Sequence, residues 1–248
     1  MAPARWPWPR VLAHRCGGQL APENTLAGLN VAHALGCRGV EFDVMLSGEG
    51  SPFVIHDETL ERTSDGCGDM SLAPDAALHA LDAGSWFDQR FAGERIPGFG
   101  HVARRCIALG LAANVEIKPA TGWDAPTARV VASAAAELWR SAAQPPLLSS
   151  FSEIALTAAA EIAPHLPRGL LVESMPADWA VRCRRLGVVA LHTEAGQVTA
   201  ALAQAVHAEG LWLVVYTEND PARARQLLEW GVDCVITDRP DIVREADT

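Results

Sequence analysis

The sequence predicts an α/β fold in which eight parallel strands close into a barrel covered by helices. One observation behind this prediction is a recurring unit, in which an amphipathic segment ends at a glycine and an apolar run begins almost at once. Glycine past a helix end tolerates the left-handed conformation that stops a helix, so the unit is typical of a helix followed by a strand. The other observation is that the apolar runs are nearly continuous, as in parallel sheets covered by helices.

The predicted strands are spread along the whole chain. They begin near Val11, Gly39, Ala113, Leu147, Gly169, Val188, Leu213 and Cys234. Helix-ending glycines stand before five of these strands, at Gly36, Gly110, Gly187, Gly210 and Gly231. Residues suited to begin a helix stand at Asn24-Thr25, Ser152-Glu153 and Asp220-Pro221.

A ninth apolar run, Pro52 to His56, follows Asp43 too closely for a parallel crossover, which needs about a dozen residues or more. We therefore expect an antiparallel return. The midpoint falls in residues 48–50, Gly-Glu-Gly, which is a natural turn. Such a hairpin carries His56 back level with Asp43, so the spacing predicts that the histidine and the carboxylate meet.

Residues from about 58 to 98 interrupt the alternation of helix and strand. They are rich in Gly, Asp and Ser, and they include Trp86, Phe87 and Phe91. A structureless loop of this length is unusual in a compact domain, so we predict a small insertion subdomain over one end of the barrel. Residues 1–248 are then a single domain.

Composition limits the classes of function. With 248 residues and 49% apolar residues, the chain can bury one sizeable core. A formal net charge of −10 argues against nucleic-acid binding and leaves room for a small anionic substrate held by local cations. The N-terminal residues lack the apolar region of a secretion signal, and no run approaches the length of a membrane span. We expect a cytoplasmic protein with no stable membrane association and six reduced cysteines, and the oligomeric state stays open.

Three carboxylates fall within predicted strands at positions that share a face. Glu41 and Asp43 are two residues apart, and so are Glu116 and Lys118. Carboxylates turned into one barrel repel each other unless a cation neutralises them, and hard oxygen ligands favour Mg²⁺ or Ca²⁺ over zinc. The alternative is that they are surface charges or form salt bridges with Arg15 and Lys118.

Two histidines, His14 and His56, stand at strand ends. An imidazole titrates near neutrality and can take or give a proton, so a pair of them suits phosphoryl transfer. Arg15 and Lys118 are candidate anion-binding residues, because arginine binds phosphate through two donors and lysine as a point charge. The other histidines are expected to be structural. Asp238 and Asn219 are expected to support the mouth of the barrel.

Several motifs in this order resemble the glycerophosphodiester phosphodiesterase family, in particular its bacterial cytosolic members. They cover nearly the whole chain, at residues 13–25, 41–44, 56–57, 60–63, 115–119, 149–151, 215–219 and 236–240. The resemblance implies a TIM barrel with an inserted subdomain, and hydrolysis of a small glycerophosphodiester to sn-glycerol 3-phosphate and an alcohol. It also implies the roles of residues. Glu41, Asp43 and Glu116 would bind the metal ion. His14 and His56 would transfer protons, and Arg15 and Lys118 would bind the substrate phosphate.

Three departures from the family pattern are visible. Cys16 replaces a glycine, and we expect its side chain to enter the mouth of the site, where it crowds substrate or makes activity sensitive to oxidation. Tyr216 keeps an aromatic wall, and Glu218 adds a charge. Two other functions stay open: a lipid phosphodiesterase of the phospholipase C or D type on the same barrel, and a non-catalytic barrel that binds glycerophosphodiesters.

Overall fold

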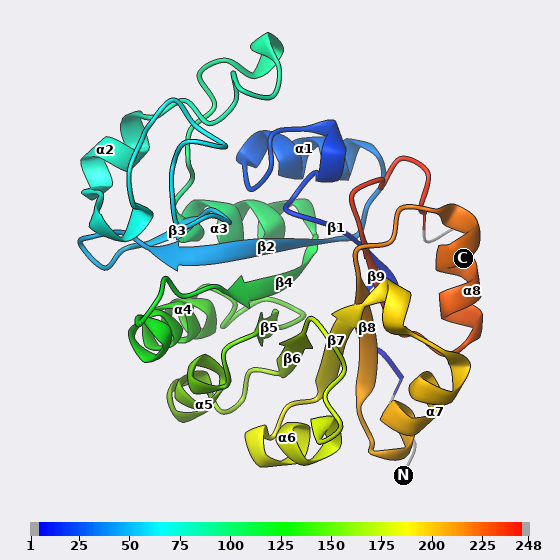
Figure 1. The fold of residues 1–248 in the computed structure, drawn as a ribbon. Helices are drawn as coiled ribbons and strands as arrows, with labels where there is room; N and C mark the ends of the chain where they lie inside the picture. Colours follow the sequence, from blue (N-terminus) through cyan, green and yellow to red (C-terminus); the bar gives the residue numbers. More distant parts are fainter. Residues whose placement is uncertain (1–4, 245–248) are drawn as a thin grey trace.

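The structure is a computed structural model that describes residues 5–244 (Figure 1). The strands of this part of the chain are β1 (Val11–Ala13), β2 (Gly39–Leu46), β3 (Pro52–Val54), β4 (Ala112–Ile117), β5 (Leu147–Ser150), β6 (Arg168–Val172), β7 (Ala190–Glu194), β8 (Trp212–Tyr216) and β9 (Cys234–Thr237). All of them except β3 pair in parallel, and β1 pairs with both β2 and β9, which closes the ring. The predicted eight-stranded parallel barrel is confirmed, and each strand begins within two residues of its predicted start.

Helices surround the ring of strands, as Figure 1 shows. They are α1 (Leu26–Ala34), α2 (Asp75–Ala80), α3 (Phe99–Leu109), α4 (Asp124–Leu138), α5 (Glu153–Ile162), α6 (Trp179–Leu186), α7 (Ala200–Ala208) and α8 (Pro221–Glu229). The side chains of Thr25, Ser152 and Asp220 accept backbone N–H groups at the starts of α1, α5 and α8, as predicted. Gly110 and Gly187 end α3 and α6 in the left-handed conformation. Among residues 5–244, no helix is long and apolar enough to span a membrane.

β3 lies outside the ring and forms a hairpin with the barrel strand β2. Val44 pairs with Val54 in antiparallel register, and the backbone N–H of Ile55 donates to the carbonyl of Asp43 at 3.1 Å. The antiparallel return is therefore confirmed. Its register places Ile55 opposite Asp43, so the prediction that His56 lies level with Asp43 was wrong by one residue. His56 instead follows directly after the paired segment, beyond the end of β3.

Residues on each barrel strand alternate between the helices and the barrel interior. On β2, Val40, Phe42 and Val44 pack toward the helices, in an apolar cluster that includes Phe99 and Val102 of α3. The intervening residues of β2 point inward, and these include Glu41 and Asp43. Because side chains alternate between the two faces of a strand, the residues that pack against the helices also determine which residues point into the barrel interior.

The segment between β3 and α3 has a small core of its own. It contains α2 and two 3₁₀ helices, Met70–Leu72 and Gln89–Phe91, and it projects from one side of the ring in Figure 1. Leu60, Met70 and Leu78 pack with Met45 and Phe53 of the hairpin, in a cluster separate from those of the barrel. The segment is thus folded against the hairpin rather than against the barrel wall.

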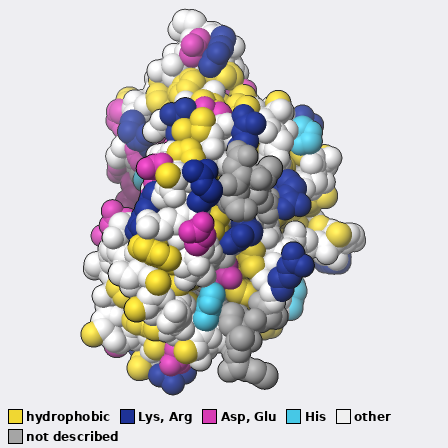
Figure 2. Space-filling model, turned by 90° about the vertical axis from the view of Figure 1, so that its right-hand side faces the viewer, with side chains coloured by type: hydrophobic (Ala, Val, Ile, Leu, Met, Phe, Trp, Pro, Cys, Tyr) yellow, Lys and Arg dark blue, Asp and Glu magenta, His cyan; other side chains and the backbone are white. Residues whose placement is uncertain are grey.

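The surface carries charged side chains of both signs (Figure 2). Figure 2 shows one face, on which Lys and Arg side chains are interspersed with hydrophobic, acidic and uncharged ones. Together with the net charge of −10, this arrangement lacks the dense basic footprint that phosphate-backbone binding needs on the described part of this face.

Candidate active site

One cavity at the carboxyl ends of the barrel strands contains every side chain that the sequence singled out for chemistry. Its volume is about 270 Å³, and its lining includes His14, Arg15, Glu41, Asp43, His56, Glu116 and Lys118. Six of the seven come from β1, β2 and β4 or the residue or two after them, and His56 follows β3. Barrel enzymes of this architecture place their chemistry at this end.

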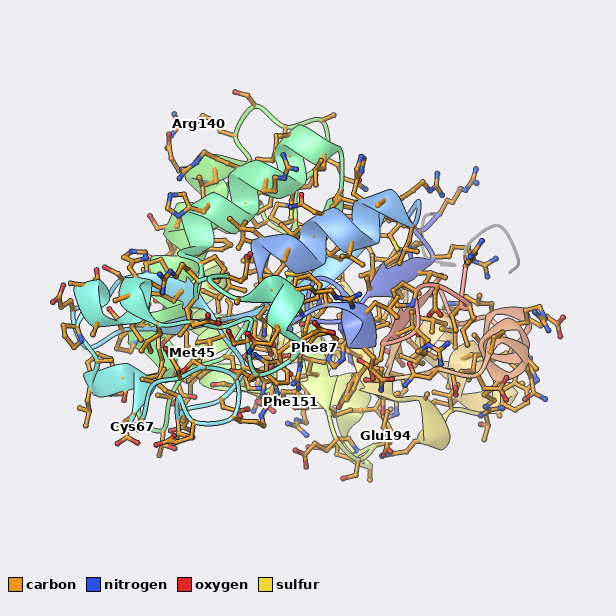
Figure 3. All side chains as sticks on the ribbon, turned by 90° about the horizontal axis from the view of Figure 1, so that it is seen from above. Met45, Cys67, Phe87, Arg140, Phe151 and Glu194 are labelled. Carbon is orange, nitrogen blue, oxygen red and sulfur yellow. The ribbon has the colours of Figure 1, made fainter. Side chains whose placement is uncertain are left out.

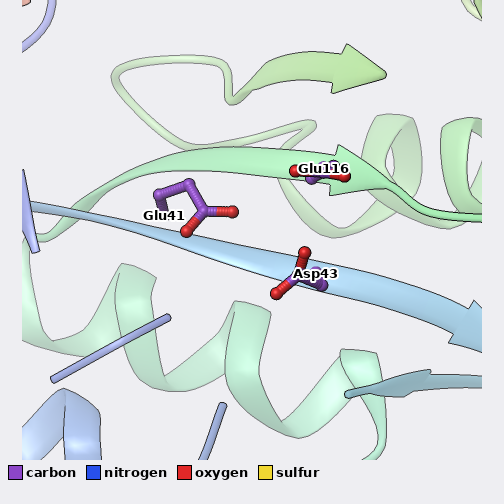
Figure 4. Close-up of side chains that lie close together, drawn as sticks. All are labelled: Glu41, Asp43 and Glu116. Atoms are coloured by element: carbon purple, nitrogen blue, oxygen red, sulfur yellow. The ribbon is translucent and has the colours of Figure 1, made fainter. Parts of the chain in front are cut away.

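The three carboxylates of the cavity lie close together. Glu41 and Asp43 project from β2 toward Glu116 on β4, as Figure 4 shows, and oxygen atoms of the three lie within 4.8 Å of one another. Register explains the arrangement, because Asp43 pairs directly with Glu116 across the two parallel strands. All three are buried, so the sequence-based alternative of surface charges was wrong.

Burial and mutual repulsion shape the titration of the carboxylates. Burial, with the charge of Asp43 added, raises the pKa of Glu41 to about 7 and that of Glu116 well above its usual value. Burial also acts to raise the pKa of Asp43, but the charges of Lys118, His56 and Arg15 outweigh it and lower that pKa. The cluster can hold a divalent metal ion, because such an ion supplies the positive charge that buried carboxylates need.

His14 is held in place by a residue that follows the neighbouring strand β9. Its Nδ1 lies 2.6 Å from Oδ1 of Asp238, and Asn219 donates to the other oxygen of that carboxylate at 3.2 Å. Its Nε2 lies 3.8 Å from Glu41. Burial lowers the pKa of His14, but the hydrogen bond to Asp238 and the charge of Glu41 outweigh it, so the pKa is raised. Asp238 and Asn219 therefore support the site as predicted.

His56 has a carboxylate partner of a different origin. Its Nδ1 lies 2.6 Å from Oδ1 of Asp57, the next residue in the chain. Burial lowers the pKa of His56, and the positive charges of Arg15 and Lys118 lower it further against the opposing charge of Asp43. The two histidines thus share one arrangement, with Nδ1 on a carboxylate, and their pKa values shift in opposite directions.

The two cations lie between the carboxylates and the open space of the cavity. Nζ of Lys118 lies 3.5 Å from Asp43 and 3.8 Å from Glu116. Arg15 donates its backbone N–H to Glu41 at 3.0 Å and one guanidinium nitrogen to Glu23 at 2.9 Å. Its Nε is buried without a hydrogen-bond partner among the described residues. It lies 3.8 Å from Oδ2 of Asp43, which is beyond hydrogen-bond distance but within ion-pair distance.

Comparisons with known proteins agree with this geometry. A sequence model of the glycerophosphoryl diester phosphodiesterase family matches residues 14–242. The chain belongs to this family. The prediction from its motifs is confirmed, and so is the prediction that the chain is an enzyme of the phosphodiesterase class.

Individual relatives are similar over nearly the whole chain. A glycerophosphodiester phosphodiesterase from Caldanaerobacter subterraneus subsp. tengcongensis is 32% identical, over 93% of this chain and 94% of that protein. One from Bacillus subtilis is 28% identical, over 93% and 84%. The solved structure of an Oleispira antarctica phosphodiesterase, in complex with the product sn-glycerol-3-phosphate, is similar to this chain with a TM-score of 0.91 and 35% sequence identity. The match covers 97% of this chain and 98% of that one.

Four residues of the site had no predicted role. Asn24 donates its side-chain amide to Asp43 at 2.9 Å, Asp57 binds His56, and Glu23 binds Arg15. Arg62 contacts both Asp57 and Glu23. All four fall within the motifs that point to the family. Their polar character within those motifs was the available signal, but spacing does not reveal which of these side chains pair.

Cys16 departs from the expectation for it. It does not line the cavity, and it is fully buried in the apolar cluster that contains Leu29 and Phe99. Burial raises the pKa of its thiol well above the usual value, which disfavours the reactive thiolate. The expectation that its side chain enters the mouth of the site was wrong, because the chain turns there with a φ of 75° and seats the thiol in the core. All six cysteines are free, as predicted.

The other two departures have clear positions. Tyr216 lines the cavity, its hydroxyl donates to the carbonyl of Val172 at 2.9 Å, and its ring meets that of Phe151 edge to face. Phe151 lies near the middle of the molecule in the view from above (Figure 3). The carboxylate of Glu218 accepts the backbone N–H groups of Asn219 and Asp220, so its charge serves the loop before α8. Tyr216 is thus the aromatic wall that was expected.

Proposed function

We propose that this chain hydrolyses glycerophosphodiesters to sn-glycerol 3-phosphate and an alcohol, through two histidines that exchange protons beside a divalent metal ion. The observation that carries the proposal is the single cavity lined by both histidines, both cations and all three carboxylates. Membership of the family supports the reaction, and the similar phosphodiesterase with bound sn-glycerol-3-phosphate supports the product.

Glu41, Asp43 and Glu116 would hold the metal ion. Three buried carboxylates within 4.8 Å fit such an ion, since their oxygens are hard ligands and their negative charge is only partly offset by Lys118 and Arg15. We propose Mg²⁺, with Ca²⁺ as the alternative, because both take oxygen ligands. When bound, the ion lowers the pKa of a nearby hydroxyl and offsets negative charge at phosphorus.

Arg15 and Lys118 would bind the substrate phosphate. Arg15 and Lys118 both line the cavity, and both are held by the carboxylate of Asp43, at 3.8 Å from Nε of Arg15 and 3.5 Å from Nζ of Lys118. Their positive charges would stabilise the negative charge that builds up on the phosphoryl oxygens in the transition state.

His14 and His56 would move the protons. Carboxylates carry no hydrogen when ionised, so each Nδ1 donates its own, and each Nε2 is the nitrogen that exchanges a proton. One histidine takes the proton of a glycerol hydroxyl as that oxygen attacks phosphorus, and the other protonates the alcohol that leaves. Water then opens the cyclic phosphate with the histidine roles reversed, which gives sn-glycerol 3-phosphate.

The test is release of sn-glycerol 3-phosphate from glycerophosphocholine, glycerophosphoethanolamine and glycerophosphoglycerol, before and after chelation. We expect activity to vanish on chelation and to return most fully with Mg²⁺. Equal activity after thorough chelation would remove the metal from the proposal, and a fully active His56→Ala variant would remove the two-histidine mechanism.

The same experiment separates the other functions. Release of a phosphorylated head group or cleavage of intact lipids would indicate the phospholipase type. Metal-dependent binding without product would indicate a binding barrel. We further propose that the enzyme acts in the cytoplasm on a small dissolved substrate, which stays a prediction from the sequence.

A further inference from the structure

Arg62 connects two sides of the active site through its guanidinium group. It follows His56 by six residues, in the segment that leads into the small core around α2. Its Nε and Nη2 donate to the two oxygens of Asp57 at 2.5 and 3.0 Å. Its Nη1 and Nη2 donate to the two oxygens of Glu23 at 2.8 Å each. Each carboxylate is therefore bound in the two-pronged manner that fixes orientation as well as distance.

Both carboxylates continue to residues of the proposed mechanism. Oδ1 of Asp57 lies 2.6 Å from Nδ1 of His56, and Oε1 of Glu23 accepts from Nη1 of Arg15 at 2.9 Å. A chain of hydrogen bonds thus runs from the histidine through Arg62 to the phosphate-binding arginine. We propose that Arg62 is a positioning residue, which fixes the ring of His56 through Asp57 and the guanidinium of Arg15 through Glu23. This inference rests on the proposed function.

Charge makes the position of Arg62 hard to replace. The hydrogen bonds of Arg62 are the largest cause of the lowered pKa of Asp57. Burial acts to raise the pKa of Glu23, but the hydrogen bonds and charge of Arg62 and the charge of Arg15 outweigh burial and lower that pKa. Both carboxylates are therefore ionised. Without Arg62, two negative groups on the same rim lose the cation between them. A lysine has one point charge and cannot bind four oxygens in a plane.

The tether differs from an ordinary surface ion pair. Arg62 is 45% exposed, but its two partners are only 14% and 25% exposed, and both lie against groups that line the cavity. An exposed pair alone contributes little to stability. We therefore expect Arg62 to matter more for the geometry of the site than for the stability of the fold.

The experiment compares Arg62→Met and Arg62→Lys with wild type, as metal-loaded full-length enzymes. A misplaced catalytic group costs about 100-fold in rate, so we expect Arg62→Met to lower kcat about 10- to 100-fold. Inhibition by sn-glycerol 3-phosphate should weaken by a smaller factor, because Arg15 loses its orientation. Arg62→Lys should recover only a minor part of kcat. Arg90→Met is the matched control, since Arg90 belongs to the same segment, packs on Phe91 and does not line the cavity.

Double variants test the route of the effect. In an Asp57→Asn background, Arg62→Met should lower kcat by much less than in wild type, because the two changes break the same connection. In a Glu23→Gln background, it should no longer weaken inhibition by sn-glycerol 3-phosphate. Thermal unfolding of every variant checks that the proteins are folded. If Arg62→Met does not fold, the same measurements are made on Arg62→Lys.

The inference is overturned if Arg62→Met and Arg62→Lys have wild-type kcat and wild-type inhibition by product. It is also overturned if the losses of Arg62→Met and Asp57→Asn multiply fully, since Arg62 then acts by another route. Failure of the proposed function looks different: the wild-type enzyme would release no sn-glycerol 3-phosphate, or His56→Ala would be fully active.

Discussion

The two histidines of the site have the same kind of partner but are anchored in different ways. His14 binds Asp238, which follows β9, and Asn219 after β8 orients that carboxylate. His56 binds its chain neighbour Asp57, and Arg62 from the segment outside the ring holds that carboxylate. One half of the site is thus fixed by the register of a closed barrel. The other half depends on contacts made by a segment with a separate small core.

This difference indicates that the two halves differ in local stability. Each barrel strand is hydrogen-bonded to a neighbouring strand on both sides around the ring. In contrast, β3 pairs only with β2, and the segment after β3 lies outside the ring. Segments with their own small core open locally at a lower free energy than the global unfolding of a domain. The His56 half should therefore be the first to lose its geometry.

The largest expected effect is loss of either histidine. General acid–base catalysis contributes about 10²- to 10⁴-fold, so His14→Ala and His56→Ala should each lower kcat by a factor in that range. Steady-state rates with glycerophosphocholine at saturating metal measure the effect. A loss of less than about tenfold in one variant would show that the halves are not equal partners in the chemistry.

Next in size is the removal of a core side chain from each region. Leu78 of α2 and Leu170 of β6 are both fully buried, so Leu78→Ala and Leu170→Ala remove the same atoms. Such changes cost about 2 to 5 kcal/mol. Leu170→Ala should lower the global unfolding temperature. Leu78→Ala should speed hydrogen exchange in residues 58–98 and lower kcat at temperatures below that of global unfolding. Equal losses of global stability would show that the two cores unfold as one.

The carboxylate partners should give a smaller effect. Asp57→Asn and Asp238→Asn each replace an acceptor-only group with an amide, which removes the charge that stabilises a protonated imidazole. We expect kcat to fall about 10- to 100-fold, comparable to the loss of partners that orient ligands in metal sites. The comparison is sharpened if Asp238→Asn resists mild heating and Asp57→Asn does not. Identical temperature profiles for the two variants would contradict it.

The smallest effect concerns acid stability of the barrel. His192 points into the barrel interior from β7, fully buried and without a hydrogen-bond partner among the described residues, and burial lowers its pKa to about 3. The unfolded chain binds a proton below pH 6.5 while the folded chain does not until about pH 3, so stability falls as pH falls through that window. The expected slope is about 1.4 kcal/mol per pH unit.

A His192→Leu variant should flatten this dependence. Denaturant unfolding between pH 6.5 and 4.5 measures the difference, with His165→Leu as the control, because the side chain of His165 is exposed. The same slope in both variants would show that other groups dominate the acid response.

The barrel and most of the site follow from local patterns in the sequence. Alternation along a strand placed Glu41 and Asp43 on one face, and glycines after helices marked where strands begin. The turn at residues 48–50 was sufficient to predict the hairpin. Because these signals involve residues close in the chain, the physical rules for helices and strands apply directly.

The errors and omissions involve contacts and directions that the spacing of residues does not report. The register of β2 and β3 was one residue from the expected one, because the pairing is set by how both strands pack and not by the midpoint of a loop. Cys16 was placed in the mouth of the site, since nothing in the sequence reveals which way a left-handed turn directs a side chain. The pairing of Arg62 with Glu23 joins residues 39 positions apart, and no periodicity reports it.

The position of β3 has a consequence for self-association of the chain. A strand outside a closed ring presents backbone groups that another chain can pair with. Here the returning chain covers it: the N–H of Val54 donates to the carbonyl of Pro97 at 2.9 Å, and Phe53 forms an isolated bridge with Gly98. A shortened protein that lacks the segment through Gly98 would leave that edge open, and it should self-associate through β3 besides losing activity.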